Sequence, residues 1–378
     1  MRRSALIAAA ALAICCAGCG APVHPREVEQ LQLVQTLGYD SDGDTVTVSV
    51  SSGRALGGGS AALLSAQGAS VTDAIRNLQS WSAREELFFA HVRFAVVGET
   101  AAREGIAPVL DFFERNTQTA LDLPLFIVRG ATARELIAAS PDPEYEVTAL
   151  LASLTRDAER MGTEHCFTVL EAARQLGRSG AALCPAVRPA PAAENAPSAE
   201  EGATALLPAG YGVLRGGALV GFLDEEEALG TDLLLGLSGQ SCYVLPCGEG
   251  RVTVELRSSR ADITPCADGA EGPGALIGLV CRAGIVEAEG VEDLTGSALP
   301  TLSAALAQRI DGQIAAALSA SARLGTDFLE LGRRLGIPGM THGLPASLRW
   351  RTQVTAVIER SYDIGRSEDL TGGGQGHG

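Results

Sequence analysis

The chain has 378 residues with a hydrophobic content of 46%, which is enough to build the cores of two or three domains of ordinary size. Aromatic residues make up only 4%, so these cores must consist mainly of Leu, Val, Ala and Ile. The formal net charge is −16. A surface this acidic argues against nucleic acid as a partner and against lying flat on anionic lipid, because both require basic side chains against phosphates.

The first residues have the pattern of a lipoprotein signal peptide. Two arginines follow the first methionine, and residues 5–14 are an unbroken apolar run. This run is much shorter than the ~20 residues that span a bilayer. The small pair Ala17-Gly18 directly precedes Cys19, which is the arrangement that a lipoprotein signal peptidase recognises. We predict that residues 1–18 are removed and that Cys19 is lipidated, with ordinary secretion or a short uncleaved anchor as the alternatives.

Composition divides the rest of the chain into two halves. Residues 184–202 are rich in proline, alanine and acidic residues and have no periodic apolar face, which is typical of an extended linker. A further division of the first half near residue 140 stays open. The predicted parts are an N-terminal domain at 19–180, a linker at 181–203, a C-terminal domain at 204–364 and a disordered tail at 365–378.

In the first half, predicted strands and helices alternate. This rhythm indicates a mixed or partly parallel sheet with helices covering it. The aspartates between Gly38 and Asp44 resemble the start of a calcium loop, but Gly43 stands at the wrong loop position, so a hairpin turn is predicted. The predicted strands are 30–37, 45–50, 91–98 and 121–128, and the predicted helices are 72–79, 107–115, 132–139, 145–160 and 166–176.

The second half is predicted to be a mainly antiparallel sheet with one long helix packed across it. Apolar residues recur at steps of mostly three and four over residues 297–335, which predicts a helix of about 55 Å. A short helix is expected at 224–235. The fold class is therefore α+β, with several domains. The predicted strands of this half are 205–214, 218–222, 241–245, 251–259, 275–286 and 348–358.

Six cysteines lie beyond the predicted anchor. An even number outside the cytoplasm permits disulfides, although six cysteines allow 15 connectivities. On hairpin grounds the candidate pairs are Cys242 with Cys247 and Cys266 with Cys281. The sequence has no C-x-x-C pair, so the usual spacing of a zinc site is missing and no metal is predicted.

No catalytic constellation can be assembled from the sequence. Neither a G-x-S-x-G nor an H-E-x-x-H motif occurs. His165-Cys166 suggests a thiol nucleophile, but adjacent residues on a helix point in different directions, so a core cysteine beside a surface histidine is predicted. The acidic run 224–227 is explained by the helix dipole, which such residues stabilise by ~0.3–1 kcal/mol each. We predict no catalytic residues and no cofactor.

Five short stretches, in this order along the chain, carry a resemblance to one family. Residues 23–40 follow the predicted lipidated cysteine and end in a strand-like L-G-Y-D, and residues 68–99 match G-x-T-x-x-A-x-x-N-L followed by H-x-x-x-x-x-x-G-E. Residues 110–116 match L-D-F-x-x-R, residues 220–227 are similar to G-x-L-x-x-x-E, and residues 325–332 resemble a D-x-x-x-x-G ending. Together they resemble the Ger(x)C-type spore germination lipoproteins, although the tryptophan and aspartate that follow the cysteine there are replaced.

The resemblance implies a non-catalytic, membrane-anchored subunit of a nutrient-germinant receptor in an endospore former. Such receptors combine two polytopic membrane subunits with a lipoprotein on the outer face of the spore inner membrane. The resemblance therefore implies a palmitate-type lipid on Cys19 and a role in assembly or signalling during spore germination. Five polar positions within the matched stretches are expected to be structural: His91, Asp111, Arg115, Glu226 and Asp327.

Two other classes of protein remain as alternatives. An extracytoplasmic solute-binding lipoprotein of a transporter would need two hinged lobes around a polar cleft, and the predicted linker is too long and proline-rich for such a hinge. An extracytoplasmic hydrolase would need a nucleophile and a base, and none can be paired. Two neighbouring genes for membrane proteins, one of them transporter-like, would favour the receptor subunit.

Overall fold

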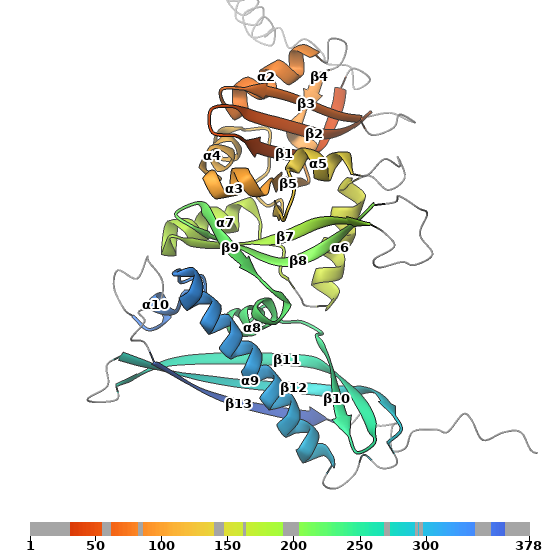
Figure 1. Ribbon diagram of the computed structural model, residues 1–378, viewed down its shortest axis with the longest axis vertical. Coiled ribbons are helices and arrows are strands. Elements are labelled where there is room, and N and C mark those ends of the chain that lie inside the picture. Colours follow the sequence, from red (N-terminus) through yellow and green to blue (C-terminus); the bar gives the residue numbers. More distant parts are fainter. Residues whose placement is uncertain are drawn as a thin grey trace, which may run out of the picture.

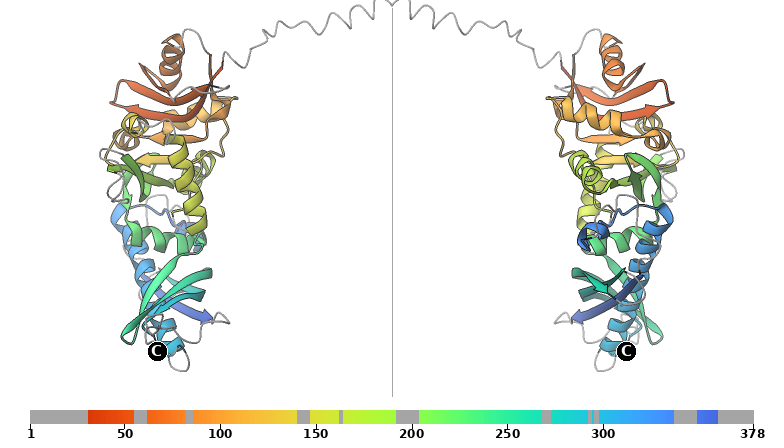
Figure 2. Two further views of the ribbon diagram at one scale, coloured as in Figure 1. Left: turned by 90° about the vertical axis from the view of Figure 1, so that its right-hand side faces the viewer. Right: turned by 90° about the vertical axis from the view of Figure 1, so that its left-hand side faces the viewer.

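The computed structural model describes residues 31–54, 62–81, 86–139, 147–161, 164–191, 204–267, 273–291, 294, 298–336 and 349–359. These residues form an elongated body, with the N-terminal strands at one end of the long axis and the C-terminal sheet at the other (Figure 1). The side views show the same stacking of parts along the long axis (Figure 2).

The larger sheet, called sheet A, has the strand order β3-β2-β1-β5-β6-β7-β8-β9, with β4 pairing to β1. The central strands β1, β5, β6 and β7 are parallel, and the outer pairs are antiparallel. The strands are β1 (Leu31–Ser41), β2 (Val46–Arg54), β3 (Ala62–Gly68), β4 (Glu86–Phe88), β5 (Phe94–Val97), β6 (Leu125–Val128), β7 (Ala181–Pro191), β8 (Thr204–Arg215) and β9 (Ala218–Leu223).

Helices cover both faces of sheet A, which explains why its central strands are apolar without alternation. On one face, Ala95 and Val97 of β5 join the core beneath α2 (Val71–Trp81), α3 (Glu99–Glu104), α4 (Ala107–Arg115) and α7 (Val169–Ser179). On the other face, Phe94 and Val96 pack with α5 (Ala133–Ala138) and α6 (Val147–Met161). The mixed sheet with helical cover predicted for this half is confirmed.

The C-terminal sheet has the order β10-β11-β12-β13. Its first three strands are antiparallel, and β13 is parallel to β12. Helix α9 crosses one face of this sheet, and α8 lies between α9 and sheet A (Figure 1). This arrangement confirms the α+β prediction. The elements are α8 (Glu225–Leu235), β10 (Cys242–Cys247), β11 (Gly250–Ala267), β12 (Pro273–Glu289), α9 (Ala298–Leu324), α10 (Leu331–Arg334) and β13 (Arg349–Glu359).

The long helix is shorter than predicted. It ends at Leu324 because Gly325 adopts a φ of +60°, a left-handed conformation that closes helices. Its 27 residues give a length of about 40 Å. The remaining apolar positions continue through a turn into α10, so one predicted helix is in fact two. The buried residues Leu302, Leu306 and Ile310 lie on the predicted face.

The predicted linker is wrong over its first part. Residues 181–191 form β7, which is buried along most of its length and pairs with both β6 and β8. Proline is tolerated here because the ladder to β6 covers only Ala186 and Val187, and Pro185 lies at a bulge against β8. Sheet A therefore continues into strands that the sequence assigned to the C-terminal domain. The other domain boundaries stay a prediction.

Two smaller differences concern the segment around the predicted strand 91–98. Its first residue, His91, ends a 3-10 turn, η2 (Phe89–His91), and the strand itself covers only Phe94–Val97. Helix α3 was not predicted, because its six residues are too short to show a periodic apolar face. The hairpin predicted around Gly43 is confirmed by the antiparallel pairing of β1 and β2.

Candidate functional site

A buried carboxylate, Asp232, joins sheet A to the helix beneath it. Asp232 lies on α8 and is 1% exposed. Its Oδ1 accepts a 2.6 Å hydrogen bond from the hydroxyl of Tyr211 on β8, and its Oδ2 accepts a 3.0 Å hydrogen bond from the backbone N–H of Glu164. The Glu164 carboxylate accepts a 3.0 Å hydrogen bond from the N–H of Gly210. Glu164, Tyr211 and Asp232, called the junction cluster, thus connect three segments that are distant in sequence.

Burial changes the acidity of the junction cluster. Desolvation raises the pKa of Asp232 to about 7, against the opposing effect of the hydrogen bonds from Tyr211 and from the Glu164 N–H. Desolvation also raises the pKa of Glu164 to about 7, and the nearby carboxylate of Glu225 adds to this shift. The two acids repel each other when both are ionised. Both oxygens of Asp232 are held by protein donors, as expected of a structural joint.

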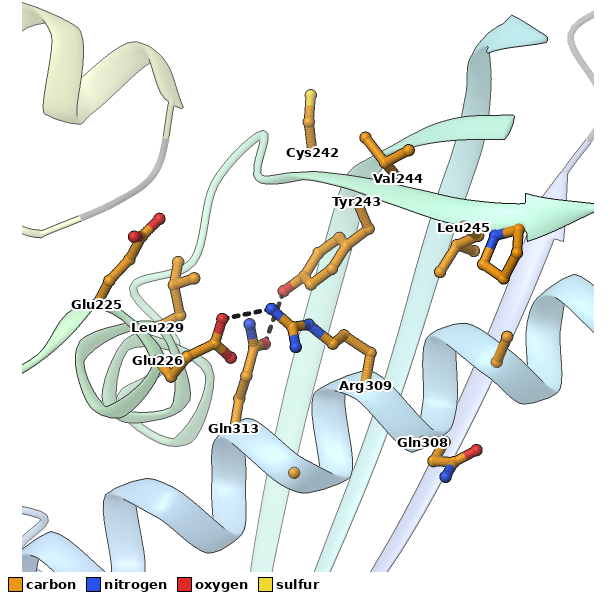
Figure 3. A pocket seen from close by; sticks show the side chains of 13 residues that line it. Glu225, Glu226, Leu229, Cys242, Tyr243, Val244, Leu245, Gln308, Arg309 and Gln313 are labelled. Carbon is orange, nitrogen blue, oxygen red and sulfur yellow. Dashed lines mark hydrogen bonds and ion pairs between the residues drawn. The ribbon is translucent and has the colours of Figure 1, made fainter. Parts of the chain in front are cut away.

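An open cavity of about 870 Å³ lies between α8, α9 and β10 (Figure 3). Glu226 of α8 forms an ion pair with Arg309 of α9 within it. The hydroxyl of Tyr243 on β10 donates a 3.0 Å hydrogen bond to Oε1 of Gln313 on α9. This cavity, called the α8–α9–β10 cavity, falls within the range of volumes that small ligands or peptide segments occupy.

The predicted lipidation site, Cys19, lies outside the described residues, so its modification stays a prediction. Six other cysteines are described, and none of them forms a disulfide: Cys166, Cys184, Cys242, Cys247, Cys266 and Cys281.

Neither candidate disulfide is formed, and the strand geometry excludes both. Cys242 and Cys247 are the first and last residues of the single strand β10, which places them roughly 16 Å apart at 3.3 Å per residue. Cys266 pairs with Gly274, seven residues before Cys281 on the same strand, so these two thiols are also far apart. A disulfide requires Cα atoms within about 7 Å. The hairpins exist, but the cysteines do not face each other across them.

His165 and Cys166 lie between α6 and α7 rather than on a predicted helix. The imidazole packs edge-on against Phe167 with ring centroids 4.7 Å apart, and its Nε2 lies 3.8 Å from the Glu171 carboxylate. The thiol lies 3.8 Å from the carbonyl oxygen of Glu164. The histidine is thus engaged by an aromatic ring and an acid, which is a structural arrangement rather than that of a base for the neighbouring thiol.

The acidic run 224–227 lies at the start of α8, and two of its residues form ion pairs with α9. Asp224 is the N-cap of α8 and forms a capping box with Glu227. Glu226 pairs with Arg309, and Glu227 pairs with Arg323 at 2.7 Å. The cap agrees with the predicted role at a helix start. The two ion pairs to α9 could not be foreseen, because the arginines lie more than 80 residues further along the chain.

The other polar positions of the matched stretches have ordinary structural partners. The His91 ring lies 5.7 Å from that of Phe88. Asp111 and Arg115 form an exposed ion pair at 2.7 Å along α4. Asp327 is buried and accepts hydrogen bonds from the N–H groups of Leu331 and Gly332 at 2.8 and 2.7 Å, so it caps α10.

Six residues of the two sites could not be singled out from the sequence: Glu164, Tyr211, Asp232, Tyr243, Arg309 and Gln313. A weak signal existed for Asp232, since it is a lone acid within the apolar stretch of α8, and for Gln313, which interrupts the apolar face of α9. Tyr211 and Glu164 had no such signal. Their contacts depend on how β8 approaches α8, which only the tertiary structure provides.

Two general properties bear on the class of protein. Among the described residues, no helix combines the length and the apolar character that crossing a membrane requires. The same residues contain no group of three or more His, Cys, Asp or Glu side chains placed to hold a metal ion.

The fold defines an elongated α+β protein with a helix-covered mixed sheet at one end and a smaller sheet crossed by a long helix at the other. Residues 24–189 match the model of the spore germination protein N-terminal domain, and residues 209–337 match that of the spore germination B3/GerAC-like C-terminal domain. The chain therefore belongs to the GerAC-like family of spore germination proteins.

Two individual proteins are similar to this chain. YfkR of Bacillus subtilis (strain 168), whose name assigns it provisionally to spore germination, is 24% identical over 199 residues. That match covers 52% of this chain and only 50% of YfkR. The crystal structure of the GerBC protein has the same fold, with a TM-score of 0.54 at 15% identity, and the match covers 88% of this chain and 99% of GerBC.

Proposed function

We propose that the chain is the non-catalytic lipoprotein subunit of a nutrient-germinant receptor and acts in assembly or signalling of that complex during spore germination. The observation that carries this proposal is the match to both family regions, in order, along the chain. Its partners would be two polytopic membrane subunits. A net charge of −16 makes nucleic acid an unsuitable partner.

A lipid on Cys19 would hold this acidic body beside its membrane partners, on the outer face of the spore inner membrane. Each buried CH₂ contributes roughly 0.8 kcal/mol, so several acyl chains form a stable anchor. The first described strand, β1, begins at Leu31, and the strands paired with it lie at one end of the long axis (Figure 1). In this proposal sheet A lies nearer the membrane than the C-terminal sheet does.

The junction cluster supports a mechanical role for the body. Tyr211 and Phe167, from the sheet A side, share one buried core with Val254 of β11 and Ile314 of α9. Movement of the C-terminal sheet would therefore be transmitted to sheet A rather than absorbed by a loose hinge. A subunit that assembles or relays between membrane proteins needs this stiffness.

Two experiments test the proposal. Deletion of the gene should impair germination with at least one nutrient, and normal germination with every nutrient would contradict receptor membership. Separately, the native chain should label with a fatty-acid probe and Cys19→Ala should not. A labelled Cys19→Ala variant would contradict lipidation at Cys19 while leaving receptor membership intact.

The α8–α9–β10 cavity favours a second candidate, the solute-binding lipoprotein of a transporter. That function requires two lobes that close on a ligand about a hinge. The core shared by sheet A, α8 and the C-terminal sheet opposes such closure. Family membership supports the receptor subunit, and the identity of the neighbouring genes discriminates between the two functions.

A further inference from the structure

Strand β10 is at the edge of the C-terminal sheet, and in the part of the chain that is described it pairs with β11 alone. The two-residue turn Gly248-Glu249 makes Cys247 and Gly250 a hydrogen-bonded pair. Because such pairs alternate along an antiparallel ladder, the N–H and C=O groups of Cys242 and Val244 point away from β11. They form an edge that can accept another strand.

This free edge borders the α8–α9–β10 cavity. All five residues of Cys242–Pro246 line the cavity. One face of a strand contributes only every second residue, so a run of five indicates that the edge itself faces the open space. Pro246 has no N–H, so the edge offers two complete pairs of backbone groups and one additional carbonyl.

The opposite wall provides a hydrogen-bonding side chain, the amide of Gln313 on α9. Gln313 is 1% exposed, and its amide makes one contact, the hydrogen bond from Tyr243 to Oε1. The amide nitrogen lies beside Tyr243 at the cavity (Figure 3). Among the described residues, the one buried side-chain polar atom without a hydrogen-bond partner is Oγ1 of Thr326, so the Gln313 nitrogen is not sealed off from the open cavity, and a peptide carbonyl there can accept its hydrogen bond.

The charge of the cavity wall favours a ligand with a basic group. Glu226 is neutralised by Arg309, but Glu225, at the same cavity, has no described ion-pair partner. Leu229 and Leu245 add apolar surface, and Gln308 adds a further side-chain amide. The cavity therefore combines a free strand edge, side-chain amides, apolar surface and one uncompensated negative charge.

We propose that the α8–α9–β10 cavity binds an extended peptide segment of a partner protein, which pairs with the outer edge of β10 and places a basic side chain near Glu225. Strand addition of this kind draws its affinity from main-chain hydrogen bonds and its specificity from side-chain pockets. The inference goes beyond the proposed function and does not depend on it, because the strand edge, the cavity and its charge are properties of the described residues alone.

The test uses the full-length chain in detergent and two fluorescent probe peptides, Thr-Val-Arg-Val-Thr and Thr-Val-Glu-Val-Thr, both capped at their ends. Fluorescence anisotropy should show saturable binding of the arginine probe with a Kd below about 1 mM. The glutamate probe should bind at least roughly fivefold more weakly, and raising the salt concentration should reduce this difference. Absence of binding by the arginine probe up to about 1 mM overturns the proposal.

Variants then locate the binding. Val244→Pro removes an outward N–H and should raise the Kd for the arginine probe roughly tenfold or more. Val244→Thr changes the side chain but keeps the N–H, so it should bind the probe like the native chain. Gln313→Leu should weaken the binding of both probes, and Glu225→Arg should make the chain bind the glutamate probe more tightly than the arginine probe. Arg323→Gln is the matched control, because it removes an ion pair between α8 and α9 away from the cavity and should leave binding unchanged.

Two outcomes contradict the assignment after binding has been found. Equal binding by the Val244→Pro variant, with its melting temperature unchanged, would place the peptide elsewhere. If the native chain dimerises in analytical sedimentation and Val244→Pro abolishes the dimer, the edge of β10 binds a second copy of the chain instead of a partner peptide. Normal germination after deletion of the gene would contradict receptor membership but would not change the peptide-binding measurements. The two proposals can therefore be refuted separately.

Discussion

The hydroxyl of Tyr211 donates a 2.6 Å hydrogen bond to the buried carboxylate of Asp232, and this bond links β8 of sheet A to α8. Helix α8 in turn packs on α9 and the C-terminal sheet. The two residues are only 21 positions apart, yet Tyr211 belongs to sheet A and Asp232 to the helix that packs on the C-terminal half.

Stability should depend on the protonation of the junction cluster. Asp232 and Glu164 have pKa values raised to about 7, so near neutrality the folded chain binds more protons than the unfolded chain does. The free energy of unfolding should therefore fall as the pH rises through about 7, by on the order of 1 kcal/mol per carboxyl between about pH 6 and about pH 8. Urea denaturation at a series of pH values measures this slope.

The variant Asp232→Asn isolates the contribution of one carboxyl. It should be less stable than the native chain at about pH 6, because the asparagine amide cannot accept both the Tyr211 and the Glu164 hydrogen bonds. Its free energy of unfolding should fall less steeply with rising pH. Asp111→Asn, at an exposed helix position, should keep the native slope. Identical slopes for native chain and Asp232→Asn would show that Asp232 does not titrate in this range.

The contact between α8 and α9 should be intolerant of a single added methyl group. A Cβ at Gly230 would lie 1.9 Å from the carbonyl oxygen of Gln313, so Gly230→Ala must separate the two helices. Alanine favours a helix over glycine by ~1 kcal/mol, but overpacking against backbone should outweigh this and destabilise the chain by roughly 2 kcal/mol. The free energy of unfolding, measured in urea for the variant and the native chain, shows whether the substitution stabilises or destabilises the chain.

Gly177→Ala in α7 is the matched control, because no atom lies within 4 Å of its added Cβ. This variant should be stabilised by up to ~1 kcal/mol through helix propensity alone. If both variants shift stability in the same direction and by similar amounts, the close approach of α8 to α9 at Gly230 is wrong.

The six described thiols should be separately reactive rather than paired. Cys242 is exposed, whereas Cys184 is fully buried and desolvation raises its pKa to about 12. Since the thiolate is the reactive form, iodoacetamide should modify Cys242 at least roughly tenfold faster than Cys184 in the folded chain. Mass spectrometry of digests follows both rates, and denaturation should abolish the difference. A non-reducing digest that contains a Cys242–Cys247 or Cys266–Cys281 disulfide would contradict the structure.

The fold was predictable wherever a local pattern decided it. The amphipathic stretch of α4, the alternating strands β1 and β2, and the hairpin around Gly43 follow from spacing and turn residues alone. Strand β7 was missed because its prolines suggest a linker. Only the tertiary structure shows that β6 pairs with two residues of β7 and leaves Pro189 and Pro191 outside that ladder.

The candidate sites were less predictable than the fold. The acidic run 224–227 correctly predicts the start of a helix, α8, but its ion pairs to α9 join residues that are far apart in sequence. The junction cluster depends on the approach of β8 to α8, and the cysteine pairs failed because register, not the presence of a hairpin, decides which residues face each other. Contacts between residues that are far apart in sequence are determined by tertiary packing, so local residue patterns do not predict them.

Purification of the tagged native chain from detergent-solubilised spore inner membranes tests the central claim most directly. If the chain is a receptor subunit, two polytopic membrane proteins are recovered with it in constant ratio, and Cys19→Ala lowers their yield by releasing the chain from the membrane. Recovery of the native chain without any membrane protein, from spores that contain it in full amount, would contradict its assignment as a receptor subunit.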